Sequence, residues 1–79
     1  MDLGEAIAYR IEYICKERGI SINKLALLSG LTQSTIDSIL KGKSKNPRLA
    51  TLKKISDGLG ITVSNLLDDP VINNADIEE

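Results

Sequence analysis

One stretch decides how this chain folds: residues 22–40 read INKLALLSGLTQSTIDSIL. Ser21 and Thr32 each stand just before an apolar run with helical spacing, and both residue types cap helix N-termini. Gly30 lies between the runs, where a tight turn needs the positive φ that glycine adopts at little cost. Ala26 is small enough for another helix to cross closely. The stretch therefore predicts two short helices, at residues 22–29 and 33–41, joined by a turn.

Apolar periodicity predicts three further helices, at about residues 3–18, 48–59 and 63–67. The expected inward stripe of the helix at 48–59 consists of Leu49, Leu52, Ile55 and Leu59. No segment alternates with the two-residue period of a strand. We therefore predict an all-α fold, a compact domain of five helices over residues 1–69. Residues 70–79 form an acidic C-terminal tail, which we expect to be flexible or to order only against a partner.

Composition excludes several function classes. A chain of 79 residues allows one small domain. It contains no His and one Cys, which excludes histidine-based catalysis, most zinc sites and an intrachain disulfide. The apolar runs are too short to span a membrane, and residues 1–5 lack the features of a secretory leader. We expect a cytoplasmic protein that is not an enzyme and that uses no membrane, metal or cofactor.

Charge is distributed unevenly along the chain. Residues 1–19 carry three basic and four acidic side chains, residues 20–56 carry seven and one, and residues 57–79 carry none and six. The three segments therefore have net charges of −1, +6 and −6, which sum to the overall −1. A basic centre followed by an acidic tail is typical of a protein with an anionic partner, although solvated helix faces can also separate charge in this way.

Two short helices joined by a glycine-containing turn form the helix-turn-helix, here at about residues 22–41. A purely structural helix pair can share any one of these features. Their combination with flanking helices and a basic centre favours a DNA-binding domain.

The segment 20–69 resembles the phage-repressor/Cro family of helix-turn-helix domains, also called XRE-type. The matching stretches are Gly19-Ile20-Ser21, Leu25-Ala26, residues 30–36 (GLTQSTI), Gly42-Lys43 with Asn46-Pro47, and Leu59-Gly60-Ile61-Thr62. The resemblance implies a lambda-repressor-like fold and sequence-specific binding of double-stranded DNA as a small transcriptional regulator, most simply a repressor. It does not specify an operator.

The resemblance also implies which side chains read bases, because the helix after the turn enters the major groove in such proteins. That helix presents Gln33, Ser34, Asp37 and Ser38 as candidate base contacts. The Gln33 amide can pair with two atoms of adenine, and serine hydroxyls reach bases directly or through water. Asp37 either accepts from cytosine or offsets the charge of Lys41 one turn further along; we favour the second role.

Other residues are candidates for phosphate contacts. Polar side chains and exposed amides at helix N-termini suit a phosphate oxygen, and the basic segment after the second helix resembles the family's backbone clamp. The candidate phosphate contacts are Ser21, Asn23, Thr32, Lys41, Lys43, Ser44, Lys45, Asn46 and Arg48. Arg48 could also reach a narrow minor groove.

Two positions depart from the family pattern. Relatives often carry Gln where this chain has Ile22, so the corresponding DNA contact is not expected here. Some phage repressors hold a buried Arg–Glu pair at the positions of Cys15 and Leu40, which are both apolar here. Packed apolar groups can replace such a pair without loss of stability. We therefore expect Cys15 to pack near Leu40 rather than to act as a redox sensor.

One short recognition helix offers few base contacts, so we expect a homodimer on a palindromic operator. The expected dimer surface is the fifth helix and the tail, which supply Val63, Leu66, Leu67, Val71 and Ile72; these residues could instead complete the monomer core. The alternative function is a protein-interaction role, such as an antitoxin-like or adaptor protein that uses the same domain. The acidic tail favours that alternative.

Overall fold

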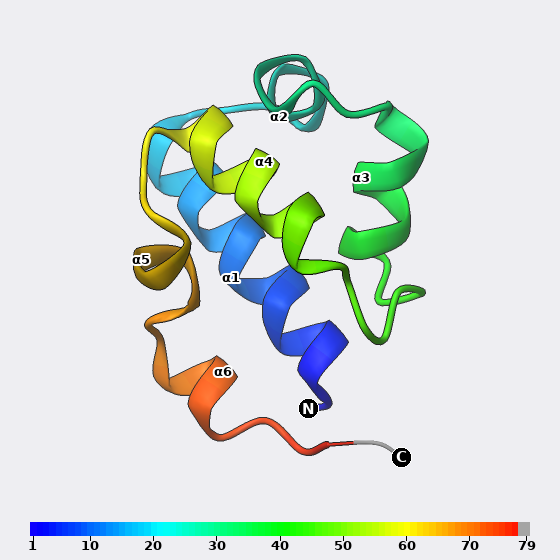
Figure 1. The fold of residues 1–79 in the computed structure, drawn as a ribbon, viewed down its shortest axis with the longest axis vertical. Helices are drawn as coiled ribbons and strands as arrows, with labels where there is room; N and C mark the ends of the chain where they lie inside the picture. Colours follow the sequence, from blue (N-terminus) through cyan, green and yellow to red (C-terminus); the bar gives the residue numbers. More distant parts are fainter. Residues whose placement is uncertain (78–79) are drawn as a thin grey trace.

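Six helices make up most of the computed structural model, which describes residues 1–77 (Figure 1). They are α1 (Leu3–Arg18), α2 (Ile22–Ser29), α3 (Gln33–Leu40), α4 (Leu49–Leu59), α5 (Val63–Leu67) and α6 (Pro70–Asn73). The all-α prediction is confirmed, and each of the five predicted helices begins and ends within one residue of its predicted bounds. The number of helices was wrong, because α6 lies in the segment expected to be a flexible tail.

Helix α1 runs through the middle of the molecule, with α2 across one end and α3 and α5 on opposite sides (Figure 1); α4 packs closely against α2. A capping box starts α1. The Asp2 carboxylate accepts from the amide of Glu5 at 2.8 Å, and the Glu5 carboxylate accepts from the amide of Asp2 at 3.1 Å. This reciprocal pair satisfies amides at the exposed helix start that have no partner within the helix.

The core lies where α1, α2, α3, α4 and α5 meet. Its largest fully buried apolar side chains come one from each of these helices: Ile11, Leu25, Ile36, Ile55 and Leu66. Burial of each such side chain contributes roughly 1.5–3 kcal/mol to the free energy of folding. Because each of these five helices supplies one of them, displacement of any one of the five exposes the buried side chains of the others.

The helix-turn-helix forms as predicted. Gly30 ends α2 with a φ of 66°, and the amide of Leu31 bonds back to the carbonyl of Ala26 at 3.1 Å. The hydroxyl of Thr32 then caps α3 by accepting from the amide of Thr35 at 3.2 Å. The turn therefore satisfies the backbone at both helix ends and sets the direction of α3 relative to α2.

Helix α2 crosses α4 very closely at Gly58. A side chain built on Gly58 would place its Cβ 2.8 Å from Oγ of Ser29 and 2.9 Å from the carbonyl carbon of Leu28. The backbone of α2 therefore occupies the space of the missing side chain. Sequence analysis predicted a close crossing at Ala26, which is buried, but did not assign a role to Gly58.

Leu49 does not belong to the inward stripe of α4. It is 66% exposed, whereas Leu52, Ile55 and Leu59 are buried. Arg48 is the residue that precedes the helix, so Leu49 is the first helical residue. Helical periodicity places Leu49 and Leu52 on one side of α4, but it does not show how far along the helix the core extends.

The described part of the tail packs against α1. Asp69 starts α6 by accepting from the amide of Val71 at 2.9 Å, and Pro70 supplies a φ suited to the first turn. Further on, the amide of Asp76 donates to the carbonyl of Met1, and the carbonyl of Asp76 accepts from the amide of Leu3, both at 3.1 Å. The last two residues of the expected flexible tail, 78 and 79, lie outside the described residues.

Within residues 1–77, none of the helices is both long enough and apolar enough to cross a membrane.

Candidate nucleic-acid interface

Helix α3 has one buried and one open face. Ile36 and Ile39 are buried, whereas Gln33 and Ser34 are exposed at the N-terminal end of the helix. One turn further, Asp37 and Ser38 are half-buried. The four candidate base contacts are therefore accessible in part or in full, and the two most exposed ones are at the end of α3 that is expected to face bases.

A shallow hollow of about 350 Å³ gathers most of this surface. It is lined by Gln33, Ser34, Asp37, Ser38, Lys41 and Lys43. All four candidate base contacts and two of the candidate phosphate contacts thus share one open depression. The hollow therefore combines hydrogen-bonding side chains of α3 with the ammonium groups of Lys41 and Lys43.

The loop between α3 and α4, residues 41–48, is here named the basic loop because it contains Lys41, Lys43, Lys45 and Arg48. The loop is anchored to α3: the amides of Lys43 and Ser44 both donate to the carbonyl of Ser38, at 3.0 and 3.3 Å. A second hollow of about 230 Å³ includes Ser34, Ser38 and Ser44. The basic loop therefore continues the surface of α3.

The hydroxyls at the two helix caps can still donate a hydrogen bond. Ser21 Oγ accepts from the amide of Lys24 at 3.1 Å, which leaves the hydroxyl proton free to donate to an anion. The Thr32 hydroxyl also lies 2.9 Å from that of Thr35, so one of the two donates to the other and the proton of the second stays available. Both caps lie at helix starts, where exposed amides and the helix dipole favour a negative group.

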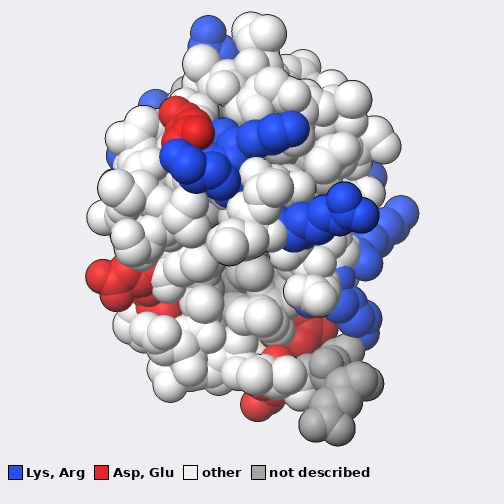
Figure 2. Space-filling view, viewed as in Figure 1, with Lys and Arg blue, Asp and Glu red and all other residues white. Residues whose placement is uncertain are grey.

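The remaining candidate phosphate contacts are exposed: Asn23 on α2, and Lys45, Asn46 and Arg48 in the basic loop. In Figure 2, several Lys and Arg side chains lie along the side where Figure 1 places α3 and the basic loop, others lie over α4, and acidic side chains lie mostly toward α5 and the C-terminal segment. The charge asymmetry predicted along the chain is therefore also an asymmetry in space.

Gly4 in α1 lies directly against the basic loop, a contact that sequence analysis missed. A Cβ on Gly4 would lie 2.7 Å from the carbonyl oxygen of Ser44 and 2.9 Å from Cα of Lys45. The only signal in the sequence was a glycine in the first turn of a predicted helix. That signal does not identify the neighbour, which is forty residues away along the chain.

Cys15 is buried beside the interface. It lines a cavity of about 440 Å³ together with Leu40. The other residues that line this cavity are Ile20, Ser21, Ile22 and Asp37, with the long side chains of Glu12, Lys16 and Lys41. Burial raises the pKa of the Cys15 thiol, and the charge of Glu12 raises it further. The neighbourhood of Cys15 and Leu40 agrees with the predicted packing role. Ile22 is half-buried and packs on the core, so it does not replace the missing Gln as a polar contact.

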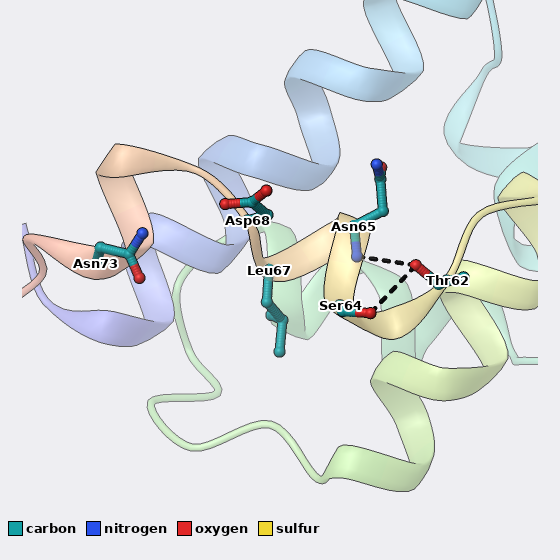
Figure 3. A pocket seen from close by; sticks show the side chains of 6 residues that line it. All are labelled: Thr62, Ser64, Asn65, Leu67, Asp68 and Asn73. Carbon is teal, nitrogen blue, oxygen red and sulfur yellow. Dashed lines mark hydrogen bonds between the residues drawn. The ribbon is translucent and has the colours of Figure 1, made fainter.

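A polar hollow of about 510 Å³ lies at the junction of α5 and α6, on the other side of the molecule from α3 (Figures 1 and 3). Its lining residues are Thr62, Ser64, Asn65, Leu67, Asp68 and Asn73. Thr62 accepts from the amide of Asn65 at 3.0 Å and from the Ser64 hydroxyl at 3.3 Å. This hollow is therefore separate from the candidate nucleic-acid interface.

The model of the Cro/C1-type helix-turn-helix DNA-binding domain matches residues 10–70. The chain belongs to this family. The match covers α2, α3 and the basic loop, so the surface described above is part of the domain that defines the family.

Individual relatives agree with this assignment. The chain is 36% identical over 63 residues to the HTH-type transcriptional regulator SinR of Bacillus subtilis, covering 80% of this chain and 57% of that protein. It is 32% identical over 63 residues to the HTH-type transcriptional repressor RghR of the same species, covering 80% of this chain and 47% of the relative. The chain thus spans about half the length of these relatives.

Among solved structures, prophage Lp1 protein 11 superimposes with a TM-score of 0.79 at 33% identity, covering 91% of this chain and 95% of that one. The two chains therefore share one fold over nearly their whole lengths.

Proposed function

We propose that this chain binds double-stranded DNA with sequence preference and acts as a transcriptional regulator, with α3 in the major groove. The observation that carries the proposal is the hollow that joins all four candidate base contacts to Lys41 and Lys43. With its side chains, an α-helix such as α3 is about 10–12 Å across, which matches the width of the major groove at about 12 Å. The Cro/C1-type match supports the same role.

Within this proposal Gln33 supplies the main base contact. Its amide is exposed at the first helical position of α3 and carries both a donor and an acceptor, as adenine requires. Ser34 and Ser38 add short hydroxyl contacts. Asp37 is half-buried and lies four residues before Lys41, so the carboxylate offsets the lysine charge within the helix surface.

Phosphate contacts position the domain on the duplex. Ser21 and Thr32 present hydroxyls at helix starts, and Asn23 adds an exposed amide. The basic loop adds cations and polar groups beside α3, through Lys41, Lys43, Ser44, Lys45, Asn46 and Arg48. These contacts are independent of sequence and supply most of the salt-dependent affinity.

Repression is the direction of regulation that we propose, and the cytoplasm is the expected location. One relative of this chain, RghR, is named a transcriptional repressor. The alternative of an antitoxin-like or adaptor role is not favoured, because the similar proteins are named as transcriptional regulators. A non-enzymatic role fits a family defined by a DNA-binding domain.

We further propose that two copies bind a palindromic operator, with half-sites about 34 Å apart or at multiples of that distance. Leu66 is fully buried in the monomer and does not contribute to a dimer surface. Val63, Leu67, Val71 and Ile72 are half-buried, and Leu67 lines the hollow at α5 and α6. The dimer surface that we propose is centred on this hollow.

The first experiment is a fluorescence-anisotropy titration with a randomised duplex pool at 50 and 200 mM salt, followed by sequencing of the bound fraction. Enrichment of a palindrome, with an affinity that falls by about 10³–10⁵ between the two salt concentrations if 6–10 phosphates are contacted, supports the proposal. Absence of binding at 50 mM salt refutes it.

Three variants then test the residue roles. Gln33→Ala should relax one base position by about 1–3 kcal/mol and leave the others unchanged. Lys43→Ala should weaken binding to all sequences and reduce the salt slope by about 0.9, whereas the matched control Lys54→Ala, on exposed α4 surface, should not. Equal slopes for both lysine variants contradict the assignment of the basic loop.

Neighbouring asparagines test the dimer surface. Asn73 lines the hollow at α5 and α6, whereas exposed Asn74 is not among its lining residues. Asn73→Arg should reduce cooperative binding to a two-half-site duplex, and Asn74→Arg should not. Light scattering on the DNA complex gives the number of copies bound. A single copy on a palindromic duplex refutes the dimer.

A further inference from the structure

The first turn of α1 and the basic loop meet without a side chain between them. The Cβ position of Gly4 lies 2.7 Å from the carbonyl oxygen of Ser44 and 2.9 Å from Cα of Lys45, distances at which real Cβ atoms are essentially never found. Both neighbours are backbone atoms, so no rotation of a side chain can make room. The loop lies as close as it does because residue 4 is glycine.

Space, rather than backbone conformation, requires this glycine. The glycines with positive φ are Gly19, Gly30, Gly42 and Gly60, and Gly4 is not among them. Gly4 therefore has a helical backbone that alanine adopts more readily than glycine does. Glycine does not stabilise the helix at this position, so it is the neighbouring loop that requires a glycine at residue 4.

We propose that Gly4 is a positioning residue for DNA binding: it lets the basic loop lie against α1, and this sets where Lys43 and Lys45 present their charges. The inference rests on the proposed function, because it assumes that these lysines contact phosphates. It adds to that function a residue on α1, a helix with no candidate DNA contact of its own.

The α1 side of the contact is rigid. Its first turn is closed by the reciprocal capping pair of Asp2 and Glu5. From the other side, Asp76 forms backbone hydrogen bonds with Met1 and Leu3. The neighbouring residue Ala6 is fully buried in the core. An added methyl group at position 4 therefore cannot be accommodated by a shift of α1.

On the loop side, the contact is made by Ser44 and Lys45. The start of the loop is held by the carbonyl of Ser38 on α3, which accepts the amides of Lys43 and Ser44. Beyond this anchor, Lys45 and Asn46 are exposed, and the chain reaches the start of α4 at Leu49. A methyl group on residue 4 would therefore displace the loop outward between its anchor on α3 and α4, and the displacement would be greatest at Lys45.

The test is Gly4→Ala, measured by anisotropy on one fixed duplex of mixed sequence labelled with fluorescein, because phosphate contacts do not depend on sequence. Removal of one lysine–phosphate pair lowers the slope of log K against log[salt] by about 0.9. Between 50 and 200 mM salt, the ratio of wild-type to variant affinity should therefore shrink about 3.5-fold if one such pair is broken and about 12-fold if two are. Stability to urea should equal or exceed that of the wild type.

The matched control is Gly58→Ala, which adds a methyl group to another helical glycine with a tight neighbour, here the backbone of α2. It should lower stability to urea, whereas Gly4→Ala should not. Amide chemical shifts of Gly4→Ala by NMR should change mainly at residues 43–47 and in the first turn of α1. Lys43→Ala combined with Gly4→Ala should lower the slope by less than the sum of the two single effects.

Three results overturn the inference: a Gly4→Ala slope equal to that of the wild type, a Gly4→Ala chain that does not fold, or amide shifts spread through the core instead of the loop. Failure of the proposed function is distinguishable, because the wild-type chain then shows no salt-dependent binding, or Lys43→Ala leaves its slope unchanged. In either of those cases the inference falls with the function.

Discussion

Replacement of Gly58 by alanine tests how closely α2 and α4 cross. The new Cβ would lie 2.8 Å from Oγ of Ser29, and 2.9 and 3.0 Å from the carbonyl carbon and oxygen of Leu28. Two of these three atoms belong to the backbone of α2, which is held by its Ser21 cap and by buried Leu25. The two helices must therefore separate or tilt to admit one methyl group.

The magnitude follows from two opposing effects. Overpacking of a fitted contact costs about 1–3 kcal/mol of stability. Alanine in place of glycine inside a helix contributes about 1 kcal/mol in the opposite direction. Because the close atoms are mainly backbone, the cost should be near the upper end, and the net loss about 1–2 kcal/mol. For a domain of this size that corresponds to a fall in Tm of about 4–16 °C.

Urea denaturation followed by circular dichroism measures the change, and Ser29 supplies the control. Ser29 Oγ is buried and has no hydrogen-bond partner among the described residues, so Ser29→Ala should be neutral or slightly stabilising. In the double variant, removal of that oxygen should recover part of the Gly58→Ala loss, with a coupling of at least about 0.5 kcal/mol. The contact with Leu28 remains, so recovery should be incomplete.

A Gly58→Ala variant that is as stable as the wild type or more stable refutes this reasoning. Helix propensity would then outweigh packing, and α2 and α4 would not be in backbone contact at this point.

Three further predictions follow from burial and hydrogen bonding. In chemical denaturation, Leu52→Ala should cost about 2–5 kcal/mol and Leu49→Ala less than about 0.5 kcal/mol. The reason is that Leu52 is 5% exposed and Leu49 is 66% exposed. Equal losses would contradict the described start of α4. Arg10→Ala should cost about 2–3 kcal/mol in the same assay, because this guanidinium donates to the carbonyls of Leu66 and Asn65 at 3.0 Å and joins α1 to the end of α5. Substitutions of exposed residues cost less than about 0.5 kcal/mol, so a loss below that value would show that these hydrogen bonds contribute little. The Cys15 thiol should react slowly with thiol reagents in the native protein. The free energy of unfolding should fall as pH rises from the ordinary thiol pKa of 9.0 through the raised native pKa, because the thiol of the unfolded chain ionises first. A Cys15→Ala variant with the same alkaline loss of stability as the wild type would refute this.

Local chemistry explains why much of the fold could be read from the sequence. The caps at Ser21 and Thr32, the turn at Gly30 and the apolar spacing of α2 and α3 each depend on residues a few positions apart. Such interactions join residues that are close together in the sequence. They predict the fold best where the caps, the turn and the apolar spacing all agree. The family resemblance rests on the same letters, and it was confirmed by the match to the Cro/C1-type domain.

Candidate interface residues were also readable in part. The helical period puts Ser34 on the side of α3 away from Ile36 and Ile39, and Gln33 is exposed because it is the first residue of the helix. The sequence could not show that the basic loop continues that face, since this depends on the bonds to the Ser38 carbonyl and on the turn of the chain after α3. The roles of the candidate interface residues in DNA binding stay predictions.

Tertiary structure alone decided the long-range contacts. By itself, the sequence determined the class of fold, the helix-turn-helix and the separation of charge along the chain. It did not determine that Gly4 meets the basic loop, that Gly58 meets α2, that Asp76 bonds to the backbone at the start of the chain, or that Leu49 faces outward. The physical reason is that a cap or a helical period involves residues within one or two turns, whereas these contacts join segments that only the complete packing of the helices brings together.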